Sequence, residues 1–194
     1  FIVFDGKAIL GTRARKVRSK SFAAFDSIGY PIAAFIDDNR IIKYLEAPAV
    51  SGEVRFAASI SDSVFLLKLI PGIRPEILAY LGEHYDIIVI ESYGVGGIPF
   101  YDKRNFLNEL QALTEKGKII VIATQVMLEG SDAEKYEVGA LALDRYNVLQ
   151  SFDMTVESAV TKLMWLCAEH EGYEEIRDGF YKCINHDLLY DPKN

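Results

Sequence analysis

The chain has 194 residues, half of them apolar, which is enough for one α/β domain with a buried core and part of another. Its formal net charge of −7 argues against binding to nucleic acid or to an anionic membrane surface. No apolar run approaches the ~20 residues that a membrane-spanning helix needs. Two cysteines, Cys167 and Cys183, are too few for a disulfide framework and favour a reducing, cytoplasmic setting.

The first 45 residues are predicted to form antiparallel hairpins. The apolar or alternating stretches are Phe1–Phe4, Ala8–Leu10, Ile32–Ile36 and Arg40–Leu45. Asp5-Gly6 lies between the first two stretches and is a strong hairpin signal. Because a strand at the very first residue needs neighbours on both sides, we interpret the chain as part of a longer protein.

A basic segment, Gly11–Lys20, is predicted to be an irregular loop between the two hairpins. It carries Arg13, Arg15, Lys16, Arg18 and Lys20. These charges have three interpretations: a solvated run with ion pairs, a phosphate or nucleic-acid patch, or the position of a catalytic lysine that orients a carboxylate. The residues alone leave the three open.

From about residue 60 the pattern changes to alternating strands and helices. The predicted strands are Val64–Ile70, Asp86–Ile90 and Lys118–Ala123, and the predicted helices begin near Pro75 or cover Asp102–Lys116, Ala133–Leu143, Thr155–His170 and Tyr173–Cys183. Thr155 is expected to cap its helix. Ile/Val runs that alternate with helices predict a three-layer, Rossmann-like parallel-sheet domain. The predicted organisation is 1–45 hairpins, 46–59 linker and 60–194 α/β domain.

Ligands of open parallel sheets bind beside the carboxyl ends of the strands, so the loops there are the candidate sites. The loop Glu91–Pro99 contains Gly94, Gly96 and Gly97, which suit either a tight structural turn or a ligand or subunit loop. Thr124-Gln125 and Glu129–Asp132 suit either a small polar ligand or a solvated loop. No histidine neighbours a Ser or Cys nucleophile, and no metal-ligand spacing occurs, so neither a metal nor a cofactor is predicted.

Several stretches together resemble the L-asparaginase family, specifically its type I, cytoplasmic branch. They are Gly11–Val17 with Phe22–Ser27, Ile70–Gly72, Ser92–Pro99, Ala123–Gln125, Tyr136–Gly139, Asp153–Glu157 and Thr161–Trp165. They occur in the family's order across nearly the whole chain. The resemblance implies that residues 1–45 are the end of an N-terminal domain, and that 60–194 are the C-terminal domain.

The resemblance also implies an activity and one catalytic residue. Asparaginases of this kind hydrolyse L-asparagine to L-aspartate and ammonia with a threonine nucleophile in a Thr-Gly-Gly-Thr segment, and use a second Thr-Asp pair in a Gly-Thr-Asp-Thr segment. Neither segment occurs in the 194 residues. A lysine stands behind that Asp in the family, and the register places Lys16 on it. The chain alone is therefore expected to be inactive.

In this family the active sites lie at the interface of an intimate dimer, which implies a homodimer or a dimer of dimers. The resemblance places Tyr93, Gly96 and Gly97 on a loop that reaches the partner's substrate, although the family usually has Asn where this chain has Gly97. An allosteric asparagine site known in some type I enzymes uses an arginine and a cysteine. This chain has Glu91 and Val126 there, so that regulation is not predicted.

Two other functions remain open. One is the related asparaginase-like subunit of a tRNA-dependent amidotransferase, which would act on glutamine and deliver ammonia. The other is a non-catalytic α/β module for dimerisation or for binding a small ligand. The sequence upstream of Phe1 and an ammonia-release assay would separate these alternatives.

Overall fold

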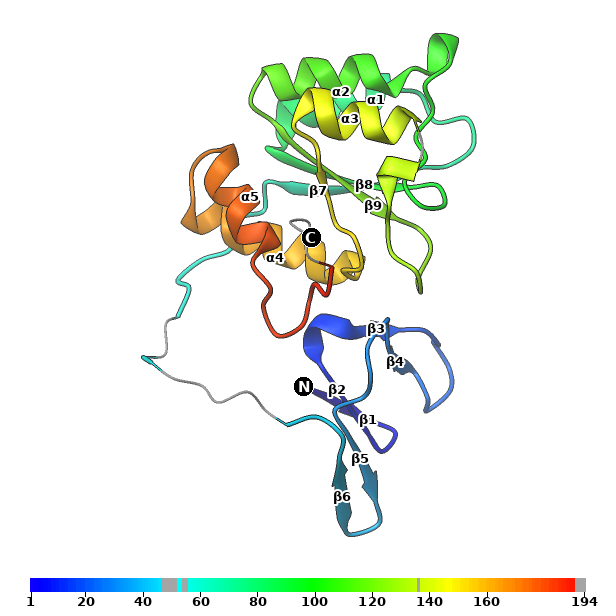
Figure 1. Cartoon of the computed structure of the whole chain (residues 1–194), viewed down its shortest axis with the longest axis vertical. Coiled ribbons are helices and arrows are strands. Elements are labelled where there is room, and N and C mark those ends of the chain that lie inside the picture. The colour runs from blue at the N-terminus through cyan, green and yellow to red at the C-terminus, as the bar shows by residue number, and fades with distance from the viewer. Residues whose placement is uncertain (47–51, 54–55, 136, 191–194) are drawn as a thin grey trace.

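The computed structural model describes residues 1–46, 52–53, 56–135 and 137–190. The predicted linker, 46–59, therefore has two gaps, 47–51 and 54–55, that lie outside the described residues. Figure 1 shows the hairpin part at one end of the molecule and the α/β part at the other, with the C-terminal segment between them. Within the described residues, none of the helices combines the length and the apolar character needed to cross a bilayer.

The two predicted hairpins are confirmed. β1 (Ile2–Phe4) pairs with β2 (Lys7–Ile9), and β5 (Ala34–Asp37) pairs with β6 (Arg40–Lys43), all antiparallel in the order β1-β2-β5-β6. Asp5 and Gly6 both have positive φ, 50° and 71°, as a tight two-residue hairpin turn requires.

The prediction of an irregular basic loop over Gly11–Lys20 is confirmed for Val17–Lys20 and was wrong for Gly11–Lys16. Gly11–Arg13 forms a 3₁₀ turn, η1, and Ala14–Lys16 forms strand β3, which pairs antiparallel with β4 (Phe25–Ser27). The strand escaped prediction because charged side chains occupy positions where a buried strand would have apolar ones. Of its two charged side chains, Arg15 has a distant partner, which is described below, and Lys16 is exposed.

The α/β part contains a four-stranded parallel sheet. Its strands are β7 (Val64–Lys68), β8 (Ile87–Ser92), β9 (Ile119–Thr124) and β10 (Leu149–Gln150), in the order β10-β9-β8-β7. Every residue of β8 and β9 is buried, as their Ile/Val runs predicted. β10 was not predicted, because two residues carry no periodic signal.

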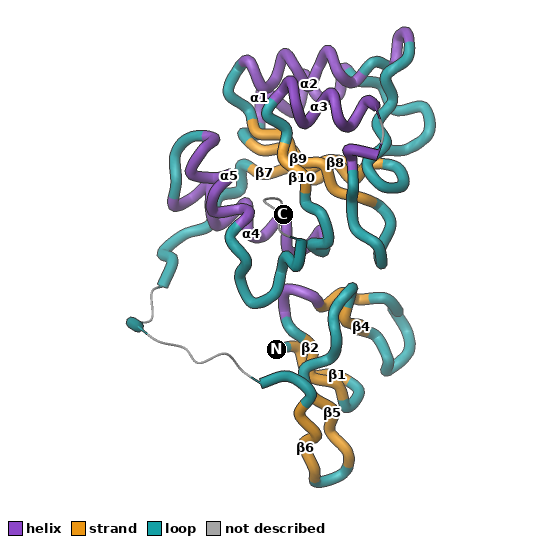
Figure 2. Tube along the Cα trace, viewed as in Figure 1, coloured by secondary structure: helices purple, strands orange, loops and turns teal. Residues whose placement is uncertain are grey.

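Helices cover both faces of this sheet, which confirms the three-layer prediction (Figures 1 and 2). The helices of one layer are α1 (Glu76–His84), α2 (Phe106–Glu115) and α3 (Glu137–Tyr146). Those of the other layer are α4 (Val156–Glu169) and α5 (Tyr173–Tyr181). Ile88 and Ile120 face the first layer, whereas Ile87 and Val121 face the second.

Helix ends follow their capping residues. The Thr155 hydroxyl accepts a hydrogen bond from the Ser158 N–H at 3.1 Å, so the predicted cap of α4 is confirmed. The helix predicted from Asp102 begins later. Asp102–Arg104 is a 3₁₀ turn, and the Asn105 side chain caps α2 by accepting from the Leu107 N–H. In the same way, the 3₁₀ turn Ala133–Lys135 precedes α3.

Candidate functional site

Arg13 joins the hairpin part to the α/β part. Its side chain is fully buried, and its nitrogen atoms donate to three acceptors from distant segments. Nε donates to the His186 carbonyl at 2.6 Å, and Nη1 donates to the Asp153 carbonyl at 2.7 Å. Nη2 forms an ion pair with Asp153 Oδ2 at 2.7 Å. The guanidinium also lies 5.6 Å from the centre of the Tyr30 ring.

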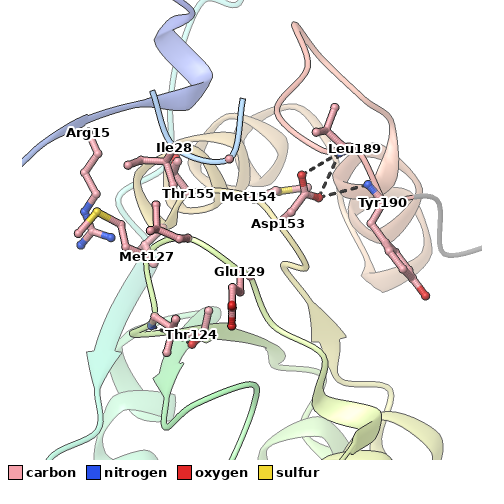
Figure 3. Close-up of a pocket in the computed structure, with 15 residues that line it drawn as sticks. Arg15, Ile28, Thr124, Met127, Glu129, Asp153, Met154, Thr155, Leu189 and Tyr190 are labelled. Atoms are coloured by element: carbon pink, nitrogen blue, oxygen red, sulfur yellow. Dashed lines mark hydrogen bonds between the residues drawn. The ribbon is translucent and has the colours of Figure 1, made fainter. Parts of the chain in front are cut away.

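Asp153 is the partner residue on the α/β side, between β10 and α4. Besides its bond to Arg13, its carboxylate accepts from the N–H groups of Leu189 and Tyr190 at 3.1–3.2 Å (Figure 3). Thr155 Oγ donates to the Thr12 carbonyl at 3.2 Å, and Thr12 Oγ donates to the Asn185 carbonyl at 2.7 Å. The joint therefore ties three segments: η1, the start of α4 and the C-terminal segment.

A pocket of about 380 Å³ opens beside this joint, at the carboxyl ends of β9 and β10. Arg15, Ile28 and Gly29 line it from the hairpin part, and the loops after β9 and β10 line it from the other side (Figure 3). This is where ligands of parallel sheets bind. Several of its polar groups, however, are engaged within the protein. Arg15 Nε, for example, lies 3.2 Å from Glu157 Oε1.

Lys16 lies on the opposite face of β3 from Arg15, since neighbouring residues of a strand alternate. Its side chain is exposed, and Nζ lies 5.9 Å from the centre of the Phe25 ring, its cross-strand partner. Phe4 packs against both Phe25 and Phe22, with ring centres 5.5 and 6.0 Å apart. Lys16 is thus placed beside a partly exposed aromatic cluster (Phe4, Phe22 and Phe25), away from the pocket.

The glycine loop after β8 is a tight turn. The Tyr93 N–H donates to the Gly97 carbonyl at 2.9 Å, and the Gly97 N–H donates back to the Tyr93 carbonyl at 2.7 Å. Gly96 has φ 143°, and a Cβ there would lie 2.6 Å from Ala133 Cα. Gly96 is buried, whereas Tyr93 and Gly97 are half-buried. The structure therefore gives Gly96 a packing role, and it does not bring this loop to Lys16 within one chain.

The polar residues after β9 bind the chain's own backbone. The Thr124 hydroxyl donates to the Gly94 carbonyl and accepts from the Val126 N–H. The Gln125 amide donates to the carbonyls of Leu69 and Glu91 at 2.7 and 3.0 Å. These bonds hold the ends of β7, β8 and β9 together.

Glu91 is buried at the end of β8, and its carboxylate lies 3.3 Å from Lys68 Nζ at the end of β7. This ion pair joins the ends of β7 and β8. Among the described residues, no group of three or more His, Cys, Asp or Glu side chains is arranged to hold a metal ion.

The sequence does not single out Arg13 or Asp153 as site residues. Arg13 lies inside the basic run, where nothing in the sequence distinguishes it from the other basic residues. Asp153 stands two residues before the predicted cap Thr155. The one local signal at this position is an aspartate close to the start of a helix, where a negative charge is favoured.

Comparison with known proteins defines the class of this molecule. Residues 63–180 match the glutaminase/asparaginase C-terminal domain, so this α/β part is a domain of that class. The match covers more than half of the chain. The chain therefore belongs to the glutaminase/asparaginase family, as the sequence resemblance indicated.

Three relatives illustrate this membership. The L-asparaginase of Thermococcus kodakarensis is 38% identical over 91% of this chain and 53% of its own length. Its solved structure matches with a TM-score of 0.90 at 36% identity, over 96% of this chain and 56% of that chain. L-asparaginase 1 of Escherichia coli K12 is 28% identical, over 98% of this chain and 56% of its own length.

The third relative carries a different name. It is a glutamyl-tRNA(Gln) amidotransferase component of Methanosphaera stadtmanae, 30% identical over 86% of this chain and 38% of its own length. The chain thus spans about half the length, or less, of these curated relatives.

Proposed function

We propose that this chain is the C-terminal part of an asparaginase that hydrolyses L-asparagine to L-aspartate and ammonia. The observation that carries the proposal is the similarity to the L-asparaginase of Thermococcus kodakarensis, which extends over both the hairpin and the α/β parts. In this proposal residues 1–45 end the N-terminal domain and residues 60–194 form the C-terminal domain. The setting is cytoplasmic.

Lys16 is the catalytic residue that this chain contributes. A threonine hydroxyl is a weak nucleophile until a neighbouring group accepts its proton. A lysine beside a carboxylate can orient that carboxylate and stabilise it during the proton transfer. The threonines and the aspartate come from a part of the protein outside these 194 residues. Lys16 is exposed, and among the described residues its side chain contacts the Phe25 ring but makes no hydrogen bond or ion pair, which is consistent with polar partners from that part.

An exposed apolar surface of the hairpin part supports the same proposal. Large apolar side chains of the hairpin part are exposed, including Phe1, Val3, Phe22 and Ile41, at 57–80% of their full area. An apolar surface of this kind marks a region that other protein covers. The part that carries the threonines would bury this surface and close the site around Lys16.

The second contribution concerns the neighbouring protomer. In a homodimer or a dimer of dimers, Tyr93, Gly96 and Gly97 would approach the partner's substrate. Gly97 has no side chain to contact that substrate, and its N–H is already donated to the Tyr93 carbonyl at 2.7 Å. Gly96 would keep the loop close to Ala133, which is consistent with a rigid edge for the partner's site.

A second candidate function is that of an asparaginase-like amidotransferase component. It is favoured by the 30% identity to the glutamyl-tRNA(Gln) amidotransferase component of Methanosphaera stadtmanae. Such a protein would release ammonia from glutamine for a partner enzyme.

Ammonia release by the full-length protein tests both functions. The expected result is turnover of free asparagine without any partner or tRNA. Turnover of glutamine that requires a tRNA and a second protein would favour the amidotransferase. Ammonia release from neither amide would overturn the proposed function and favour the non-catalytic module.

A further inference from the structure

We infer that Arg13 and Asp153 position Lys16 for catalysis, by clamping the start of β3 to the α/β domain. The inference rests on the proposed function, in which Lys16 is the catalytic residue. Arg13, Asp153 and the His186 carbonyl are called the clamp below. Neither side chain touches Lys16, so both are positioning residues.

The clamp fixes Arg13 in orientation as well as in position. Its three acceptors, the His186 carbonyl, the Asp153 carbonyl and Asp153 Oδ2, lie 2.6–2.7 Å from three different nitrogen atoms. A guanidinium is a planar fork with fixed donor directions, so three such bonds define its plane. Because the side chain is fully buried, no water can replace these bonds if it shifts.

Asp153 is fixed in turn by a second set of bonds. Its carboxylate accepts from the N–H groups of Leu189 and Tyr190, and its own backbone leads into the cap of α4. α4 packs on the central sheet through Leu163 and Leu166. The clamp therefore fixes the position of η1 relative to the rigid core of the α/β domain.

Strand β3 connects this fixed point to Lys16. The strand begins at Ala14, immediately after Arg13, and Lys16 is its last residue. Among the described residues, no hydrogen bond or ion pair holds the Lys16 side chain, so its backbone decides where it lies. A second contact, Arg15 to Glu157 at 3.2 Å, holds the same strand from the pocket side.

A positional role of this kind has a distinct kinetic consequence. Displacement of a reacting group by about 1 Å can cost on the order of 100-fold in rate. Substrate binding, by contrast, depends on groups other than Lys16. Loss of the clamp should therefore lower kcat and leave KM nearly unchanged, whereas a purely structural role would lower only stability.

Two clamp variants and one control in the full-length protein test the inference. Arg13→Lys keeps the charge, but one ammonium cannot reach the three acceptors in the geometry of the fork. Asp153→Asn is nearly isosteric and keeps the test open if Arg13→Lys does not fold. Leu110→Ala opens a cavity in the α1–α3 layer and destabilises the protein away from the clamp. The rate of ammonia release from asparagine is normalised to the folded fraction, measured by circular dichroism.

The expected result is a kcat reduced about 10- to 100-fold in both clamp variants, with KM within about 3-fold of wild type and a normal kcat in the control. If the clamp variants keep the kcat of the control, the inference is overturned while the proposed function stands. If the wild-type protein releases no ammonia from asparagine, the proposed function itself fails, and the role of the clamp fails with it.

Discussion

Lys162 and Asp187 form an ion pair that is buried between α4 and the C-terminal segment. Lys162 Nζ lies 2.8 Å from Asp187 Oδ2, and the two side chains are only 4% and 2% exposed. Nζ also donates to the Lys182 carbonyl at 2.7 Å, and Asp187 Oδ1 accepts from the Ile184 N–H at 2.7 Å. With both charges bonded in this way, the pair fastens the chain after α5 to the helix beneath it.

Removal of one partner of this pair should strongly destabilise the fold. Asp187→Asn and Lys162→Met each leave a buried polar or charged group without its partner, which typically costs about 3–5 kcal/mol in free energy of unfolding. The double variant Lys162→Met/Asp187→Leu should lose less than the two single variants together. Urea denaturation measures all three. A loss under about 1 kcal/mol in the single variants would contradict the prediction.

The control for this experiment is Lys118→Met. It removes an ion pair whose aspartate, Asp86, is 63% exposed. Such exposed pairs contribute at most about 1 kcal/mol, so the variant should denature nearly as the wild type does.

Tyr181 should make the protein sensitive to alkaline pH. Burial raises the pKa of its phenol to about 12 from the ordinary value of 10.0. The folded protein therefore keeps this proton to higher pH than the unfolded chain does. The stabilisation is complete below pH 10 and is lost as the pH rises from about 10 to about 12, by about 2–3 kcal/mol for a shift of about two units.

Tyr181→Phe tests this dependence. The variant loses the hydrogen bond that the Gln150 N–H donates to the phenol oxygen, so it should be less stable at neutral pH. Its free energy of unfolding should nevertheless fall less steeply than that of the wild type between about pH 10 and 12. The phenolate absorbance should also lose its highest-pH step. An unchanged slope and an unchanged absorbance titration would count against the prediction.

Gly96→Ala should destabilise the α/β domain by about 1–3 kcal/mol. The new Cβ would lie 2.6 Å from Ala133 Cα and 2.7 Å from Ala133 Cβ, at a φ of 143° that side chains disfavour. Gly11→Ala is the matched control, because no heavy atom lies within 4 Å of the Cβ there. Thermal unfolding of the two variants measures the difference. Equal midpoints would show that the loop relaxes away from Ala133.

Lys16→Met in the full-length protein should abolish turnover with little change in fold. General acid–base groups contribute about 10²–10⁴-fold in rate, so kcat should fall by at least about 100-fold. Because the side chain is exposed, the free energy of unfolding should stay within about 0.5 kcal/mol. Lys20→Met, from the same basic run and also exposed, should keep normal activity. Near-normal turnover by Lys16→Met would refute the assignment.

The parts of the fold that could be predicted are those whose reasons are local. The Ile/Val runs of β8 and β9 mark strands buried on both faces, and Thr155 marks the start of α4 through a bond to a residue three positions on. The Asp5-Gly6 turn is likewise decided by its own two residues. In each case the physical cause lies within a few residues of the pattern that reveals it.

The contacts of Arg13 with Asp153 and His186 could not be predicted, because these residues are distant in sequence. Arg13 is buried by partners 140 and 173 residues further along the chain, whereas its neighbours Arg15 and Lys16 are more exposed. A basic run gives no sign of which arginine will be fully buried. β10 was missed for a related reason. Its two residues are a strand only because β9 offers them a parallel edge.

The strand order of the α/β sheet also bears on how the chain folds as it is synthesised. Each strand from β7 to β10 is added beside the one before it, so the sheet can grow from β7 onward while the chain leaves the ribosome. The first residues of the chain cannot dock in that order. Thr12 and Arg13 must wait for Asp153, Asn185 and His186, so β3 and Lys16 reach their final place only when synthesis of this domain is nearly complete.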